Sequence, residues 1–184
     1  MCLLGTPALE AATQIARAPL ALAEVRRVQV IGHSHIRPWC EPLEERRRPR
    51  NAAAAANSVL FGVAKALCNG DVLLGDFTAA GLSDARAAAV AELTTYALDD
   101  RVAGGLVRVE TKDARVIESH VEIPLGHPSR PLSDERLAAK FADCCSYAAT
   151  PLPRGRIDQL LRLLEHLDET DDVGILAAMA GGVL

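Results

Sequence analysis

Aromatic side chains make up only 3% of this 184-residue sequence, although apolar residues reach 49%. A buried core must therefore be built from aliphatic side chains, mainly Ala, Leu and Val. Long apolar runs are also lacking, because Asn57, Ser58 and Lys65 interrupt the alanine-rich stretch of residues 52–67. The sequence also lacks the basic segment and apolar run of a signal peptide. We therefore expect a soluble, cytoplasmic protein that does not bind a membrane.

The sequence lacks the C-x-x-C pairs of a zinc site and an excess of positive charge. Its five cysteines are an odd and unevenly spaced set, which predicts no disulfide framework and favours a reducing compartment. The net charge is −4 with both signs interspersed, which argues against nucleic acid as a partner. The cysteines are Cys2, Cys40, Cys68, Cys144 and Cys145.

The first half of the chain predicts helices around one strand. Thr6 is predicted to cap a helix that starts at Pro7 and ends near residue 17, and residues 25–31 read as a strand that ends at Gly32. Residues 33–50 show no sustained periodicity and are predicted to be a loop or an edge element. Asn51 is predicted to cap one continuous helix that stops at Gly70, and Ser83-Asp84 to cap the next.

The second half opens with the clearest β pattern. Residues 106–111 and 116–121 both alternate, so they predict a hairpin. Further helices are predicted from Ser133, over residues 157–164 and over residues 173–179. The predicted fold class is α+β, with a small antiparallel sheet or hairpin packed with about five helices in one domain over residues 1–184.

Four segments together resemble the MmgE/PrpD family, which includes 2-methylcitrate dehydratase and cis-aconitate decarboxylase. Their order and spacing across nearly the whole chain carry the resemblance, and the last is the most specific. The segments are CLLGTPALEAAT (residues 2–13), RPRNAAAAANSVLFGVAKALCNGDVLLGDFT (residues 48–78), VRVETKDARVIESHV (residues 107–121) and GHPSRPLSDERLAAKFADC (residues 126–144).

The resemblance implies the carboxy-terminal lid domain of a lyase that dehydrates or decarboxylates a small di- or tricarboxylate. Residues 1–18 would be a remnant of the interdomain helix. Family members act without a metal or an organic cofactor, and a helical domain, absent here, supplies most of their catalytic groups. The implied partners are a helical-domain subunit or homologue, a second copy of the chain in a homo-oligomer, and the carboxylate substrate. The alternative is a catalytically inactive assembly or dimerisation protein that keeps the fold.

The chain departs from the family at positions that carry chemistry. Where members often have His in the first segment, this chain has Cys2 or Thr6. Just before the helix serine, where His or Lys is frequent, it has Asn57. A tyrosine that some members carry falls near Leu43. The catalytic residues therefore stay unassigned, and the lone chain is expected to be inactive.

Five residues remain as weak candidates for binding substrate. Arg48 and Arg50 precede the family's cleft-facing helix, so they form either a carboxylate-binding mouth or a charged surface. Asn57 and Ser58 either face the cleft or, for Ser58, bond within their own helix. His127 either contacts substrate or orders the Gly-His-Pro loop.

Two further patterns have a plainer reading beside the functional one. His33 and His35 share a face of an extended segment, with Cys40 and Glu41 close behind, so a metal site can be drawn from these four. A polar loop with two solvated imidazoles explains them equally, and no metal site is predicted. The adjacent Cys144 and Cys145 point in different directions on a helix, so at least one is expected to be a buried apolar residue.

Overall fold

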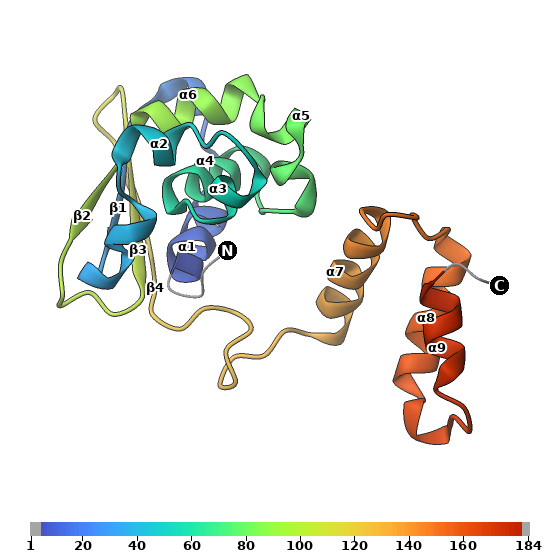
Figure 1. The fold of residues 1–184 in the computed structure, drawn as a ribbon. Coiled ribbons are helices and arrows are strands. Elements are labelled where there is room, and N and C mark those ends of the chain that lie inside the picture. The colour runs from blue at the N-terminus through green and yellow to red at the C-terminus, as the bar shows by residue number, and fades with distance from the viewer. Residues whose placement is uncertain (1–4, 182–184) are drawn as a thin grey trace. The chain divides into compact units, whose positions relative to one another are not determined.

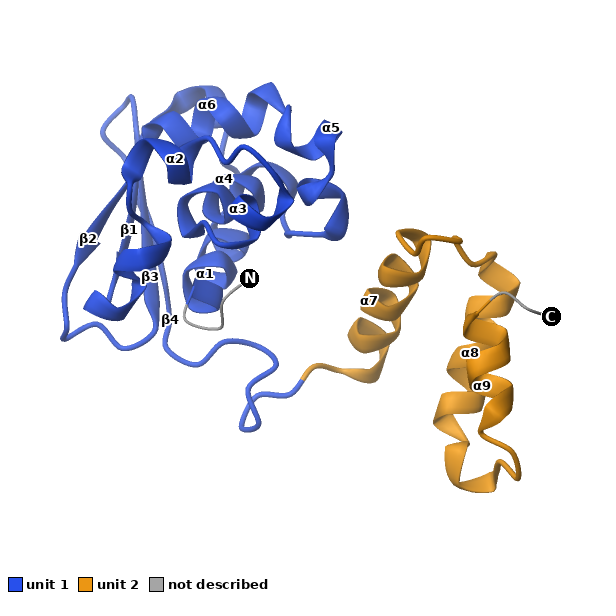
Figure 2. Cartoon of the chain, viewed as in Figure 1, with its two compact units in different colours: residues 1–131 blue, residues 132–184 orange. Residues whose placement is uncertain are grey.

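The structure is a computed structural model that describes residues 5–181. The chain divides into two compact units, residues 1–131 (unit 1) and residues 132–184 (unit 2), coloured separately in Figure 2. Among residues 5–181, no helix is both long and apolar enough to cross a membrane. The expectation of one domain with an interdomain remnant at residues 1–18 stays a prediction.

A four-stranded sheet forms one layer of unit 1 (Figure 1). Its strands are β1 (Val25–Gly32), β2 (Thr94–Leu98), β3 (Gly105–Thr111) and β4 (Val116–Val121), in the spatial order β2-β1-β3-β4. The β3–β4 hairpin and β1 confirm the predicted strands. β2 is not among the predicted elements; it pairs parallel with β1, whereas the other two pairs are antiparallel.

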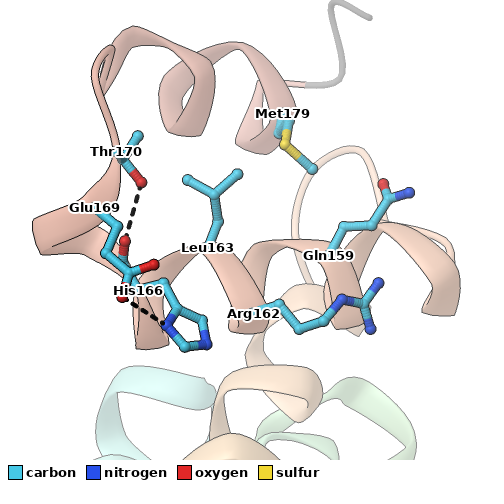
Figure 3. A pocket seen from close by; sticks show the side chains of 7 residues that line it. All are labelled: Gln159, Arg162, Leu163, His166, Glu169, Thr170 and Met179. Atoms are coloured by element: carbon cyan, nitrogen blue, oxygen red, sulfur yellow. Dashed lines mark hydrogen bonds and ion pairs between the residues drawn. The ribbon is translucent and has the colours of Figure 1, made fainter.

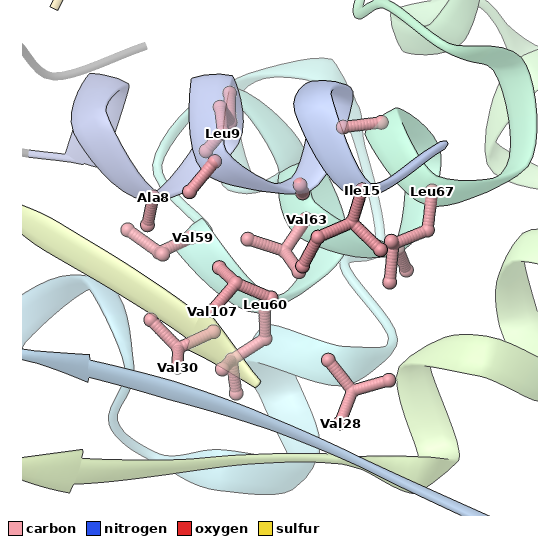
Figure 4. Packing of buried hydrophobic residues seen from close by; sticks show 14 of the residues in the cluster. Ala8, Leu9, Ile15, Val28, Val30, Val59, Leu60, Val63, Leu67 and Val107 are labelled. Atoms are coloured by element: carbon pink, nitrogen blue, oxygen red, sulfur yellow. The ribbon is translucent and has the colours of Figure 1, made fainter. Parts of the chain in front are cut away.

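Helices bury one face of this sheet. α1 (Thr6–Ala16) packs against β3 and β4, α6 (Ala85–Leu93) packs against β1, and α4 (Val59–Asn69) packs against both helices. Because strand residues alternate between faces, the fully buried valines of β1 and β3 point to the same side as one another. Figure 4 shows them meeting the aliphatic side chains of α1 and α4, among them Val28, Val30, Val107, Ile15, Leu60 and Val63. The core is aliphatic, as the scarcity of aromatic residues predicts.

Residues 33–50, between β1 and α3 (Ala52–Ala56), contain two short helices where a loop or an edge element was predicted. They are the 3₁₀ helix η3 (Ser34–Trp39) and the short helix α2 (Leu43–Arg47), joined by a bend at Pro42. Neither helix is long enough to show a periodic apolar stripe, which explains why the pattern of the sequence did not predict them.

The helix predicted to be continuous from Asn51 to Gly70 is two helices, α3 (Ala52–Ala56) and α4. Asn51 caps α3 as predicted, accepting a hydrogen bond from the N–H of Ala54, and Gly70 ends α4 in the left-handed conformation at φ 76°. The break falls at Asn57 and Ser58, because Ser58 adopts an extended conformation and starts a second helix.

Other predicted boundaries are shifted by a residue or confirmed. Gly5, not Thr6, is the N-cap of α1, so Thr6 lies inside the helix beside Pro7. Asp84 caps α6, accepting from the N–H groups of Arg86 and Ala87. The remaining elements of unit 1 are η2 (Leu22–Glu24), η4 (Leu74–Phe77) and α5 (Ala79–Leu82). The α+β class is confirmed.

Unit 2 is a small helical unit. It consists of α7 (Asp134–Ser146), α8 (Arg154–Glu165), η5 (Leu167–Glu169) and α9 (Gly174–Ala180), and the predicted cap Ser133 accepts from the N–H of Arg136. Its buried side chains are Cys145, Ile157 and Leu160. Cys145 is thus the buried member of the adjacent cysteine pair, whereas Cys144 is exposed. Several large apolar side chains of the unit are exposed: Leu137, Leu164, Leu167, Val173 and Ile175.

Candidate functional site

A pocket of about 360 Å³ lies at one end of the sheet in unit 1. The parallel strands β1 and β2 and the strand β4 all end here, and β3 begins here, so loops after three strands surround the pocket. The start of α1 closes one side through Pro7. The walls mix apolar residues with four titratable side chains, which is typical of small-molecule sites. The lining residues that carry the chemistry are His33, His35, Glu122 and His127. We call this the strand-end pocket.

The histidines of the strand-end pocket reach it from two distant segments. His33 and His35 follow the end of β1, and their rings lie 4.1 Å apart between centroids. Local bonds orient His33: its Nδ1 lies 3.2 Å from the N–H of His35, which donates to it, and 3.5 Å from a carboxylate oxygen of Asp100. His127 comes from the Gly-His-Pro loop, where its Nδ1 bonds the hydroxyl and the N–H of Ser129. The rings of His33 and His127 are therefore oriented by local contacts.

An ion pair ties the loop of His127 to α1. Arg130 donates to Glu10 at 2.5 Å and to the carbonyl of Ile123, while the N–H of Leu125 donates to the second Glu10 oxygen at 2.7 Å. Partial burial alone would raise the pKa of Glu10, but the bonds from Arg130 and Leu125 outweigh it and lower the pKa. Glu10 therefore stays ionised at neutral pH and holds this loop against α1. In the structure, His127 orders its own loop and also lines the pocket.

The predicted arginine mouth lies at the opposite end of the sheet. The Nε of Arg47 donates to the carbonyl of Thr94, the first residue of β2, whereas the strand-end pocket adjoins the last residues of the parallel strands. A second pocket of about 520 Å³ is found here, lined by Arg47, Arg48 and Glu92 over an apolar floor that includes Phe61. The structure thus does not bring His127 together with the other four candidates.

Arg48 is already paired within this second pocket. Its Nε lies 2.6 Å from Glu92, and the hydrogen bond and charge of Glu92 raise the pKa of the guanidinium. Arg50 is exposed. Asn57 is exposed too, and its side chain donates to the carbonyl of Ala53 at 2.9 Å. The role of these residues in substrate binding stays a prediction.

Ser58 has a structural role that explains its complete burial. Its hydroxyl accepts from the N–H of Phe61 at 3.1 Å and donates to the carbonyl of Arg46 at 2.5 Å. Arg46 returns to the same region, donating to the carbonyls of Pro38, Glu41 and Asn57. These hydrogen bonds of Ser58 and Arg46, which sequence reasoning did not predict, fix α2 to the start of α4.

We expect Ser58→Ala to lower the free energy of unfolding by about 1–2 kcal/mol, because the substitution removes the cap of α4 and leaves a carbonyl without its donor. The matched control is Asn51→Ala, which removes the exposed cap of the short helix α3 and should cost about 0.5 kcal/mol. Urea unfolding measures both. An unchanged stability for Ser58→Ala would contradict the structural role and favour a role in binding.

The four residues of the hypothetical metal site are not brought together. His33 and His35 line the strand-end pocket, but Cys40 belongs to the hydrophobic core, and Glu41 accepts a hydrogen bond from the hydroxyl of Tyr96. Burial raises the pKa of Cys40 to about 12, so its thiol stays protonated at neutral pH. Within residues 5–181, no group of three or more His, Cys, Asp or Glu side chains is placed to hold a metal ion. Cys2 lies outside the described residues.

Lys65 is the least expected buried group. The side chain is 1% exposed, and its Nζ lies 3.3 Å from Asp76 and 3.2 Å from Asp84. It also sits 5.7 Å from the centre of the Phe61 ring. Asp76 accepts from Asn69 and from the N–H of Leu73, so the cluster is fully hydrogen-bonded. Lys65 lies in α4, Asp76 lies in η4 and Asp84 caps α6. The ion pairs of this cluster therefore connect three elements.

Unit 2 has an open pocket of about 550 Å³ between α8 and α9 (Figure 3). Leu163 and Met179 point into it from the two helices, and Gln159 and Arg162 lie along its rim. The ion pair between its lining residues His166 and Glu169, at 3.7 Å, is largely exposed on both sides. Such a pair contributes little in water, so the strand-end pocket is the stronger candidate site.

The α+β unit, with helices over one face of a mixed sheet and a loop-built pocket at the strand ends, belongs to a recognised family. The family model of the MmgE/PrpD C-terminal domain matches residues 1–166 of the 184 residues. The chain is therefore a member of the MmgE/PrpD family, matched over its C-terminal domain. None of the curated proteins that were compared with the chain matches it.

Proposed function

We propose that this chain is the lid part of an MmgE/PrpD-type lyase and acts with a helical partner domain on a small di- or tricarboxylate. The observation that carries the proposal is the match of the C-terminal domain of the family over residues 1–166. The strand-end pocket adds support, because it gathers imidazoles that can hydrogen-bond carboxylates or transfer protons. Arg48, Arg50 and Asn57 stay candidate substrate contacts, and Arg48 lies at the other end of the sheet.

Removing water or carbon dioxide from such a substrate needs a base beside the carbon acid and cationic groups at the carboxylates. The imidazoles line the strand-end pocket, whereas the predicted substrate contact Arg48 lies beside Glu92 in the second pocket, at the other end of the sheet. We therefore propose that the partner domain supplies the remaining groups of the active site.

We expect the chain alone to give no product above background from 2-methylcitrate, citrate or cis-aconitate. Co-purified with the helical domain of a family member, it should turn over at least one of them, because the second domain completes the site. The measurement follows product formation for the chain, the helical domain and the complex. Turnover by the lone chain contradicts the need for a partner, and an inactive but stable complex contradicts the lyase role.

The alternative, an inactive assembly or dimerisation protein, draws support from two observations. Either Cys2 or Thr6 stands where family members often carry His, Asn57 stands where His or Lys is frequent, and Ser58 is used as a helix cap. The exposed apolar residues of unit 2 also suit association with a second protein surface. A stable complex with a complete homologue, formed without any gain in turnover, would favour this alternative.

A further inference from the structure

We propose that the open end of the α7–α8 helix pair in unit 2 is a docking surface for a basic amphipathic helix of another protein. The surface consists of apolar side chains from both helices and from η5, and carboxylates surround it. The inference goes beyond the proposed lyase function and does not depend on it. The apolar side chains are Leu137, Phe141, Leu161, Leu164 and Leu167.

In the described part of unit 2, burial is confined to the end at which a loop joins α7 and α8. The two helices, orange in Figure 2, contact each other. The buried side chains are Cys145, in the last turn of α7, and Ile157 and Leu160, in the first two turns of α8. Toward the other end, Leu137 is 55% exposed and Leu164 is 43% exposed. The pair is therefore packed at its joined end and uncovered at its open end.

The exposed side chains continue the apolar faces that are buried at the joined end. On α7, Leu137, Phe141 and Cys145 recur at the i, i+4 spacing, so they lie on one face of the helix. On α8, Leu164 lies two turns after Ile157 on the same face. Helical units bury such faces by adding a further helix, and a small unit with few buried side chains gains most from it. The open end therefore has the shape and apolar character that suit one more helix.

The charges around the open end select a basic partner. Asp134 and Glu135 begin α7, Glu165 ends α8, and Asp168 and Glu169 follow in η5. All five carboxylates are exposed. The same negative charge disfavours an anionic membrane, and it disfavours a second copy that presents its own open end, because like charges would then face each other.

The nearby cations do not neutralise this charge. The helical repeat places Arg136 on the face of α7 opposite the apolar one, and Arg162 lines the open pocket between α8 and α9. Lys140 borders the apolar face of α7, and His166 lies 3.7 Å from Glu169 in an exposed pair that contributes little. The carboxylates outnumber these two groups, so a helix that carries lysine or arginine beside its apolar face fits the surface.

The test measures binding of a fluorescently labelled Leu–Lys peptide of about 18 residues, with leucine at the i, i+3, i+4, i+7 spacing, to the full-length chain. One control peptide has the same composition with its leucines scattered around the helix, and another has glutamate in place of lysine. Both controls should bind at least about tenfold more weakly in fluorescence anisotropy. Raising the salt concentration from about 0.1 M to about 0.5 M should weaken binding of the basic peptide several-fold, because exposed charges are screened.

Variants connect the binding to named residues. Leu137→Gln and Leu164→Gln should each weaken binding by at least about fivefold, because they replace apolar side chains that the peptide would cover. The matched control is Leu73→Gln in unit 1, at a side chain that is 54% exposed, which should bind as the parent does. Leu164→Met keeps an apolar side chain and should also bind as the parent does. Glu165→Gln should weaken binding about twofold to threefold, whereas Glu45→Gln, at an exposed position of α2, should not.

Hydrogen exchange of backbone amides gives a second readout. The basic peptide should slow exchange in α7 and α8 by at least about tenfold and leave α1 and α4 unchanged, because a bound helix stabilises unit 2. In the free variants, the same measurement shows whether unit 2 is still folded.

Three results would overturn the inference. The first is equal binding of the peptide with scattered leucines, and the second is unchanged binding by folded Leu137→Gln and Leu164→Gln variants. The third is a chain that binds no peptide but forms dimers that Leu164→Gln dissociates, because a second copy would then cover this face. Turnover of substrate with a helical partner domain is measured separately and decides only the lyase role.

Discussion

Lys65→Ala is expected to lower the free energy of unfolding of unit 1 by about 3–5 kcal/mol, because it leaves the buried Asp76 without its cation and removes from the partly buried Asp84 one of its two cations, the other being Arg86. Lys65 is 1% exposed and lies within 3.3 Å of Asp76 and 3.2 Å of Asp84. The single tryptophan, Trp39, packs against the core of unit 1, so its fluorescence in urea follows this unit and not unit 2.

Two further variants separate the effect of losing the buried charges from the effect of shortening a lysine side chain. Lys112→Ala, at an exposed position of the β3–β4 turn, should change stability by less than about 0.5 kcal/mol. Lys65→Met combined with Asp76→Asn and Asp84→Asn removes all three charges, and Asn at position 84 still caps α6. This triple variant should regain at least half of the loss. If Lys65→Ala is as stable as the parent, the ion cluster does not stabilise the fold.

Acid should reduce the difference between Lys65→Ala and the parent. Burial alone would raise the pKa of Asp84, but the hydrogen bond from Lys65 and those from Arg86 and Ala87 lower it below its unfolded value. That contribution to stability is present above the unfolded pKa of about 3.9 and is lost as pH falls through the folded value. Unfolding curves at about pH 7 and at about pH 2, well below the unfolded pKa, should therefore show a smaller penalty at the lower pH.

Elements with a long periodic pattern or a local signal were predicted from sequence. α1, the β3–β4 hairpin and the caps at Asn51, Asp84 and Ser133 all depend on contacts within a few residues. β2 was missed because residues 94–98 become a strand through parallel pairing with β1, which lies far away in sequence. The break at Ser58 was missed because alanines and apolar residues on both sides continue a helical pattern.

The candidate site shows the same limit. His127 was singled out from its own loop, and His33 and His35 from their alternation, but only the sheet order brings the two segments to one pocket. The arginine mouth and His127 were treated together, yet they lie at opposite ends of unit 1. Lys65 carried a signal, a charge on an apolar helix face, but its partners Asp76 and Asp84 are identified only by the packing of three elements.

Gly104→Ala should be the second strongly destabilising substitution, lowering the free energy of unfolding by about 3 kcal/mol. Gly104 has a φ of +74°, and an added Cβ would lie 2.1 Å from the carbonyl oxygen of Val121 and 2.6 Å from the Cα of Glu122. Both obstacles are backbone atoms at the end of β4, so the loop must move. His120 holds the same loop through the carbonyl of Ala103 at 2.7 Å, which limits how far it can move.

Gly70→Ala is the matched control, because Gly70 has nearly the same φ, +76°, but nothing within 4 Å of an added Cβ. It should cost only the left-handed conformation, about 1 kcal/mol, so the remaining 2 kcal/mol or so at Gly104 measures the close approach of the two strand ends. Equal stabilities for the two variants would contradict the tight contact between the loop and β4.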